Sequence, residues 1–221
     1  MRQYAAALVD ELAKLGVPVH FRELAADMLL FAPGEPSVHL FIVRDGCVRL
    51  FRQTAKGRDA VLRWCGTGDL VGEEALSGEP YQAFAQTVLP TTVWLVEGVA
   101  LRAIVSRNPI LADLFFRELL RSLHQSADLA IALQGGETLL QIAKALDWLA
   151  AHVGVEERDG LVAVPFTHAQ LATFIGAARE CVTVNLRNLQ ASGIVFQQRK
   201  RLLVHLMRLR EFLNRQEPRN G

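Results

Sequence analysis

Apolar residues follow two different periods along this chain, which divide it into a β-rich and an α-rich part. Between about residues 18 and 98, short apolar runs alternate with turn sequences such as FAPGEP, VRDG and CGTGD. Evenly spaced short strands separated by glycine-containing turns predict a small antiparallel sandwich or barrel. The clearest strands are VHLFIV, CVRLFRQ, AVLRWC and TTVWLVE. A short amphipathic helix over residues 3–16 precedes them.

A helical period replaces the strand pattern after this region. Asn108-Pro109 favours a helix start, and the helix is predicted to run to about Gln134, roughly 40 Å at ~1.5 Å per residue. Its apolar residues recur at alternating spacings of three and four, which is typical of a coiled-coil seam. We expect the helix to pack on the β-rich part and to pair with a second copy of itself, the alternative being packing on the β-rich part alone. The expected dimerisation residues are Phe116, Leu119, Leu120, Leu123, Ala127 and Ala130.

Gly135-Gly136 interrupts the helical pattern and is the predicted hinge. A second helix over residues 137–153 and a short strand, LVAVPF, follow it. The pattern therefore predicts three parts, which are a β-domain at 1–107, a dimerisation helix with its hinge at 108–135, and a C-terminal domain at 136–221.

The C-terminal domain contains two short helices joined by a tight turn. Thr167 and Gln170 fit a capping box at the start of the first helix. Gly176 is expected to end that helix, and the small Ala172 and Gly176 are expected to let the two helices approach closely. The second helix begins near Ala178 and is followed by a predicted β-hairpin. The whole pattern is that of a winged helix-turn-helix.

Two charged residues stand in the first turn of the second helix. In a helix-turn-helix this end of the helix enters the major groove of DNA. Arg179 can offer two donors to a guanine, and Glu180 can accept from the amino group of a cytosine. A helical hairpin with ordinary surface charges is the alternative reading.

The distribution of charge favours the DNA-binding reading. The 221 residues are 51% apolar and 21% charged, with a net charge of +1, which is typical of a globular chain. Residues 161–221, however, contain nine Lys and Arg against three Asp and Glu, so this part suits a polyanion. No apolar run is long enough for a membrane span or a signal peptide. We therefore expect a cytoplasmic protein with no membrane partner.

The cysteines and the remaining motifs indicate which kinds of metal site and enzymatic activity are not expected. Cys47, Cys65 and Cys181 are far apart and form no CxxC, so a disulfide framework, a zinc site and a four-thiolate iron–sulfur cluster are not expected. No order of nucleophile and base, no metal-ligand spacing and no phosphate loop is present. We expect neither an enzyme nor a metal site.

In order and spacing, these motifs resemble the cyclic-AMP receptor/FNR (Crp/Fnr) superfamily of bacterial transcription regulators. The segment GDLVGEEAL is similar to the family's phosphate-cassette segment, and FTHAQLATFIGAARECVTVNLRNLQASGIV is similar to its helix-turn-helix. The resemblance implies an α+β fold with a cyclic-nucleotide-binding-like antiparallel β-roll (jelly roll), a long dimerisation helix and a C-terminal winged helix-turn-helix. It also implies a homodimer that binds palindromic double-stranded DNA, with RNA polymerase as a further candidate partner.

The resemblance also assigns the residues that face DNA. Arg179 and Glu180 match the family's two main base-reading positions. Ala178 and Cys181 replace residues that often touch phosphate, and Val184 replaces a base-contacting arginine. The DNA half-site is therefore expected to differ from the family's commonest one. The expected DNA-binding residues are Thr167, His168, Ala178, Arg179, Glu180, Thr183, Arg187 and Arg199.

The effector of the β-domain is not identified by the resemblance. Tyr81-Gln82 stand where an Arg-Ser pair holds the cyclic phosphate in the family, and no Lys or Arg occurs between Arg63 and Arg102. A buried phosphate without a cation is costly, so we do not expect cyclic AMP to bind. Glu73 would then hydrogen-bond backbone in its turn. The expected pocket residues are Gly72, Glu73, Tyr81, Gln82, Ser122, Gln125 and Ser126.

Two alternatives remain open at this stage. The segments LHQSADLAIAL and RKRLLVH also resemble the cyanobacterial global nitrogen regulator, but Glu79 and Ser122 stand where that regulator has its 2-oxoglutarate-binding arginines. The effector therefore stays unknown. In the second alternative, the chain is an allosteric metabolite-binding module whose C-terminal domain mediates protein contacts.

Overall fold

The structure, a computed structural model, describes residues 2–55, 57, 59–133, 137–198 and 201–216. The chain forms two compact units, Met1–Ser126 and Ala127–Gly221, each of which is described by itself. The predicted hinge at Gly135-Gly136 and the DNA-binding candidate Arg199 lie outside the described residues, as does the side chain of Gln125.

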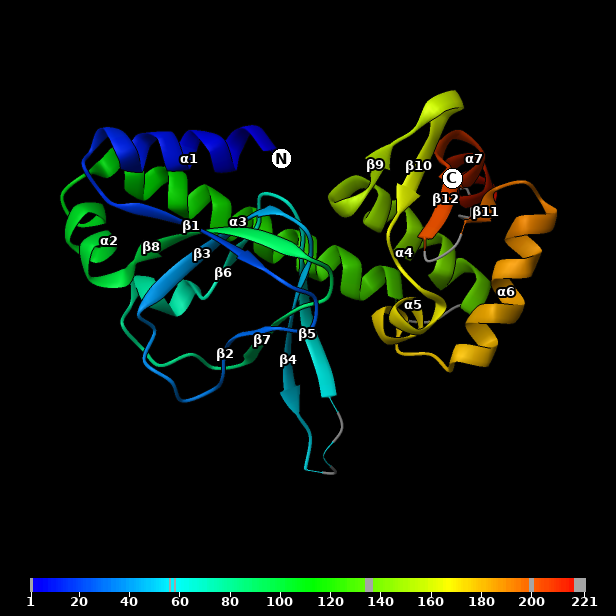
Figure 1. Cartoon of the computed structure of the whole chain (residues 1–221), viewed down its shortest axis with the longest axis horizontal. Coiled ribbons are helices and arrows are strands. Elements are labelled where there is room, and N and C mark those ends of the chain that lie inside the picture. The colour runs from blue at the N-terminus through cyan, green and yellow to red at the C-terminus, as the bar shows by residue number, and fades with distance from the viewer. Residues whose placement is uncertain (1, 56, 58, 134–136, 199–200, 217–221) are drawn as a thin grey trace, which may run out of the picture. The chain divides into compact units, whose positions relative to one another are not determined.

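The first unit is an antiparallel β-roll with three helices (Figure 1). Its strands form two four-stranded sheets, in the orders β1-β8-β3-β6 and β2-β7-β4-β5. The elements are α1 (Arg2–Lys14), β1 (Val19–Leu24), β2 (Leu29–Phe31), β3 (His39–Asp45), β4 (Val48–Gln53), β5 (Asp59–Cys65), β6 (Leu70–Val71), the 3₁₀ turn η1 (Glu73–Leu76), β7 (Phe84–Thr87), β8 (Thr91–Glu97), α2 (Gly98–Val105) and the greater part of α3 (Pro109–Leu133).

Two apolar clusters hold this unit together. Phe31, Val48 and Val93 belong to a cluster that joins the two sheets. Leu12 of α1, Leu101 of α2 and other helical residues form a second cluster with the sheet that contains β3. Burial of such side chains is the main stabilising contribution to a fold of this size. The predicted jelly roll, the long helix and the four named strands, which are β3, β4, β5 and β8, are confirmed.

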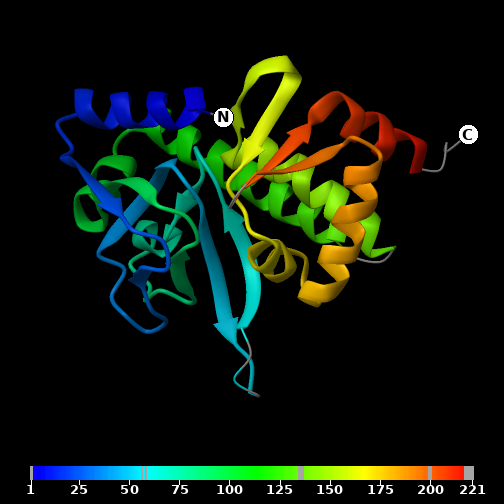
Figure 2. The same ribbon diagram turned by 45° about the vertical axis from the view of Figure 1, so that its right-hand side comes forward.

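The described part of the second unit combines four helices, α4 to α7, with a small sheet (Figure 2). The sheet has the order β11-β12-β10-β9, so the predicted two-stranded wing is part of a four-stranded sheet. Buried side chains of three helices, among them Leu146, Leu171 and Leu186, make the core. The elements are α4 (Thr138–Val153), β9 (Val155–Glu156), η2 (Arg158–Gly160), β10 (Leu161–Val164), α5 (His168–Ile175), α6 (Arg179–Ala191), β11 (Val195–Gln198), β12 (Arg201–His205) and α7 (Leu206–Gln216).

Every helix among the described residues is too short or too polar to span a bilayer. The described residues also contain no group of three or more His, Cys, Asp or Glu side chains that could hold a metal ion.

Candidate nucleic-acid interface

The first helix of the helix-turn-helix, α5, starts with the predicted capping box. The Thr167 hydroxyl accepts a hydrogen bond from the Gln170 amide at 3.2 Å, and the Gln170 side chain accepts one from the Thr167 amide at 2.9 Å. These bonds satisfy amide groups that a helix start leaves unpaired. The Thr167 hydroxyl is thus committed to the helix, and its predicted contact with DNA stays a prediction.

Gly176 ends α5 in a tight turn, as the sequence predicted, but it does not bring the two helices close together. Its φ of 70° lies in the left-handed region, which glycine adopts at little cost. A Cβ atom at Gly176 would meet nothing within 4 Å, so this glycine does not permit a close helix approach. The prediction of close approach was wrong here, because the backbone conformation of the turn requires the glycine.

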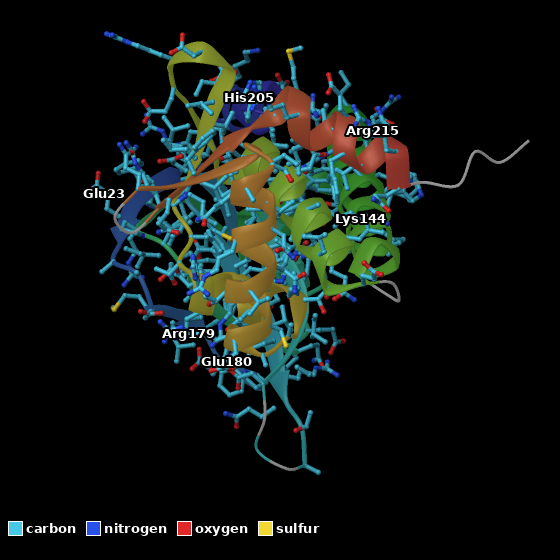
Figure 3. The ribbon with its side chains drawn as sticks, turned by 90° about the vertical axis from the view of Figure 1, so that its right-hand side faces the viewer. Glu23, Lys144, Arg179, Glu180, His205 and Arg215 are labelled. Atoms are coloured by element: carbon cyan, nitrogen blue, oxygen red, sulfur yellow. The ribbon has the colours of Figure 1, made fainter. Side chains whose placement is uncertain are left out.

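Helix α6 buries one face and exposes the other. Val182, Leu186 and Leu189 are at most 1% exposed and fix the helix on the core. Arg179 and Glu180 are exposed, and Figure 3 labels both at the N-terminal end of α6. Ala178 stands at the N-cap without a side-chain hydrogen bond, so no side chain at that position covers the first amides of α6.

His168 connects α6 to the wing. Its Nδ1 lies 3.2 Å from the Thr183 hydroxyl on α6, and its Nε2 lies 2.9 Å from the side-chain oxygen of Gln197 on β11. The Thr183 hydroxyl also donates to the carbonyl of Arg179 at 2.9 Å. His168 and Thr183 are both predicted DNA contacts, and in the structure they connect α6 to the wing.

The positive charge of the second unit is partly neutralised within the unit. Arg201 and Arg210 form ion pairs with Glu157 and Asp147 at 2.8 and 3.0 Å. Arg179 and Arg187 are exposed, and neither forms an ion pair with another described residue. These two arginines on α6 therefore supply unneutralised charge on the face that carries Glu180.

The predicted effector region of the first unit is built around Gly72. Gly72 has a φ of 81°, and a Cβ atom there would lie 2.9 Å from Cε1 of Tyr81. The Tyr81 ring stacks on Phe31 with centroids 3.7 Å apart, and its hydroxyl donates to the His39 carbonyl at 2.6 Å. Tyr81 is therefore a buried part of the core. Gln82, which follows it, is exposed.

A partly buried ion pair occupies the same region. The Arg63 guanidinium on β5 lies 2.6 Å from the Glu73 carboxylate and donates to the Ser122 hydroxyl on α3 at 2.7 Å. It also donates to the Leu70 carbonyl at 2.8 Å. Ser122 in turn accepts, through its carbonyl, a hydrogen bond from the Ser126 hydroxyl at 2.8 Å. Glu73 is therefore more than a backbone-bonding residue in its turn, because it neutralises a guanidinium that links the sheet to α3.

The sequence did not predict this role of Arg63, nor the similar role of Arg121. Arg121 of α3 forms an ion pair with Asp69 at 3.0 Å and a second one with Glu118. The available signal was a single charged residue, Arg63, inside the otherwise apolar strand AVLRWC. Arg63 therefore links α3 to β5 and η1, and Arg121 links α3 to Asp69.

Burial changes the acid–base properties of this region. It raises the pKa of Glu73 above the ordinary glutamate value, although the charge of Arg63 acts in the opposite direction. Burial also raises the pKa of the Cys65 thiol to about 12, again against the effect of Arg63. A thiol with so high a pKa is almost fully protonated near neutral pH and is a poor nucleophile. Cys181, by contrast, is exposed on α6 beside Glu180.

The predicted dimerisation residues form an exposed apolar face on α3. Phe116, Leu120 and Leu123 are 61%, 39% and 63% exposed, and Leu119 is half-buried. Ala127 and Ala130 are exposed on the same helix. Large apolar side chains grouped on one helix face commonly mark an interaction surface.

Comparison with known proteins agrees with both halves of this description. A family model described as "Cyclic nucleotide-binding domain" matches residues 21–108, and one described as "Crp-like helix-turn-helix domain" matches residues 139–212. The chain is 30% identical to the cyclic AMP receptor protein of Thermus thermophilus, with 75% of this chain and 74% of that protein covered. It is 28% identical to the CRP-like cAMP-activated global transcriptional regulator of Mycobacterium tuberculosis, with 79% of each covered.

A solved structure supports the same relationship. The crystal structure of a CRP-family transcriptional regulator from Thermus thermophilus matches with a TM-score of 0.74 and 26% identity. The match covers 87% of this chain and 96% of that one.

Proposed function

We infer the function from the family: the chain belongs to the Crp/Fnr family of transcription regulators and is a DNA-binding regulator, not an enzyme. We propose that it acts in the cytoplasm as a homodimer on a palindromic operator. Its α6 helices would enter two successive major grooves about one helical turn, ~34 Å, apart. RNA polymerase is the further partner that a regulator of transcription implies.

One observation carries the proposal of sequence-specific reading. Arg179 and Glu180 are exposed side by side in the first turn of a helix whose opposite face is completely buried. Two adjacent N–H groups of Arg179 match the O6 and N7 acceptors of guanine, and the Glu180 carboxylate matches the amino group of cytosine. Arg187 and the uncapped first turn of α6 are suited to phosphate contacts.

We further propose that the N-terminal domain is not specific for cyclic AMP, although two relatives are named for that ligand. Tyr81 stacks in the core, where the resemblance would place a phosphate-binding arginine. Arg63, whose guanidinium lies beside Glu73, already has that carboxylate as its partner. The similarity of two segments to the nitrogen regulator does not identify an effector either. Ser122 stands where that regulator has an arginine that binds 2-oxoglutarate, and the Ser122 hydroxyl instead accepts a hydrogen bond from Arg63.

Binding measurements over a range of salt concentrations test the proposal. Duplexes selected from a random library by the full chain should contain an inverted repeat, and their affinity should fall steeply as salt rises, because bound phosphates release counterions. For six phosphate contacts we expect a loss of about a thousandfold between 50 and 200 mM salt. If no duplex is selected, the competing proposal of a metabolite-binding module with a protein-binding C-terminal domain is favoured.

A further inference from the structure

Helix α6 carries one apolar side chain that the core does not use. Val184 is 56% exposed, whereas the other apolar residues of the helix with large side chains, Val182, Leu186 and Leu189, are at most 1% exposed. Residues four apart lie above one another on a helix, so Val184 follows Glu180 along the same face. The exposed face that begins with Arg179 and Glu180 therefore continues with a valine.

The neighbours of Val184 do not compete with it for the same surface. The Thr183 hydroxyl donates to the Arg179 carbonyl at 2.9 Å and lies 3.2 Å from His168. The Asn185 side chain donates back to the Cys181 carbonyl at 2.9 Å. Of these three consecutive residues, Val184 is exposed, whereas Thr183 and Asn185 are partly buried.

The chemistry of the major groove restricts what such a side chain can recognise. Among the base edges that the groove presents, the apolar group is the C5-methyl of thymine. A valine on a helix has one strongly preferred rotamer, so its methyl groups are held in place before binding at little cost in entropy. A branched apolar side chain on a groove-facing helix is thus complementary to thymine and offers nothing to the polar edges of guanine or cytosine.

We propose that Val184 determines specificity by contacting the C5-methyl group of a thymine in each half-site. This inference rests on the proposed function, because it requires α6 to enter the major groove. Val184 is five residues, about 7.5 Å, along the helix from Arg179. Base pairs are ~3.4 Å apart, so the thymine lies about two base pairs from the guanine that Arg179 reads.

A single exposed valine is also common on protein surfaces, so the test must detect the thymine methyl itself. We would replace each thymine of a selected duplex in turn with deoxyuridine, which keeps the base pair and removes only that methyl group. At one thymine per half-site, we expect the substitution to weaken binding of the full-length parent about fourfold, the value of one buried methyl-sized group. Val184→Ala should show a clearly smaller difference between the thymine and uracil duplexes, because its shorter side chain loses most of the contact with the methyl group. The matched control, Asn185→Ala, should keep the fourfold difference.

The outcomes separate this inference from the proposed function. The inference is wrong if no thymine shows the effect in the parent, or if Val184→Ala keeps the full difference. In either case the proposed function stands as long as the chain still selects an inverted repeat. If the chain selects no duplex at all, the proposed function fails and this inference fails with it.

Discussion

At the scale of single residues, the Arg63–Glu73 pair is the feature with the clearest energetic consequence. Both side chains are about four-fifths removed from solvent, with 18% and 20% of their surface exposed. A buried ion pair is not a strong source of stability, because desolvation offsets the attraction. Removal of one partner is costly, however, since the other charge then remains buried without compensation.

Arg63→Met should therefore lower the free energy of unfolding by about 3 kcal/mol at pH 7. Burial raises the pKa of Glu73 already in the parent, and removal of Arg63 takes away the largest effect that opposes this rise. A raised pKa means that the folded state holds the proton more tightly than the unfolded state. Stability thus falls as the pH rises above the ordinary glutamate value, and it is recovered as the pH falls and Glu73 is protonated.

Denaturant unfolding of parent and variant between pH 5 and pH 8 measures this effect. The difference between the two proteins should become smaller toward pH 5. Lys14→Met is the matched control, because Lys14 and Glu11 form an ion pair whose lysine is 72% exposed. Lys14→Met should lower the free energy of unfolding by less than about 1 kcal/mol. This account of Glu73 would be contradicted if both variants lost the same free energy of unfolding. It would also be contradicted if the loss caused by Arg63→Met did not change with pH.

The sequence predicted one part of the site and missed another for a physical reason. Arg179 and Glu180 could be placed because a helix-turn-helix is a local motif, in which capping, turn and apolar spacing all lie within a few residues. The bond from Arg63 to Ser122 joins residues 59 positions apart, so only the fold brings them together. Gly176 was assigned correctly to the turn, although the reason given for it was partly wrong.

At the scale of elements, the length of a strand and the periodicity of its apolar residues decided whether it could be predicted from the sequence. The four strands of the first unit that were predicted individually, β3, β4, β5 and β8, have six or seven residues and clear apolar runs. The strands β2, β6 and β9 have two or three residues, too few to show a period. β1 has six residues but is mostly exposed, so its sequence is not typical of a buried strand.

Two helices were missed for different reasons. Helix α2 has only eight residues and begins directly after β8, which hides its start. Helix α7 lies in a segment rich in arginine that the charge count identified only as basic. Its apolar residues do recur at helical spacing, and the buried Leu209 fixes it to the second unit, so this signal was available.

At the scale of the whole molecule, the account requires two copies of the chain. The exposed apolar face of α3 suits an isologous interface, in which each substitution occurs twice. Leu123→Glu should therefore weaken the dimer by about 4 kcal/mol, or roughly a thousandfold in Kd, if each copy contributes about 2 kcal/mol. Sedimentation equilibrium measures this change directly.

Val155→Glu is the control for that experiment. Val155 is 60% exposed but lies on β9, away from the dimerisation residues in sequence. This variant should sediment as the parent does. A Leu123→Glu variant with an unchanged association constant would show that the α3 face does not form the dimer.

Recognition of DNA by Arg179 is the central claim, and an affinity measurement with the selected operator tests it most directly. Arg179→Ala should lose about 1–3 kcal/mol of binding free energy. It should also lose the parent's preference for guanine over 7-deazaguanine at one position of each half-site, since 7-deazaguanine lacks the N7 acceptor. Arg158→Ala, an exposed arginine of the same unit, should bind as the parent does. If Arg179→Ala binds the operator as tightly as the parent and keeps the preference for guanine, Arg179 does not read a base and the account is wrong.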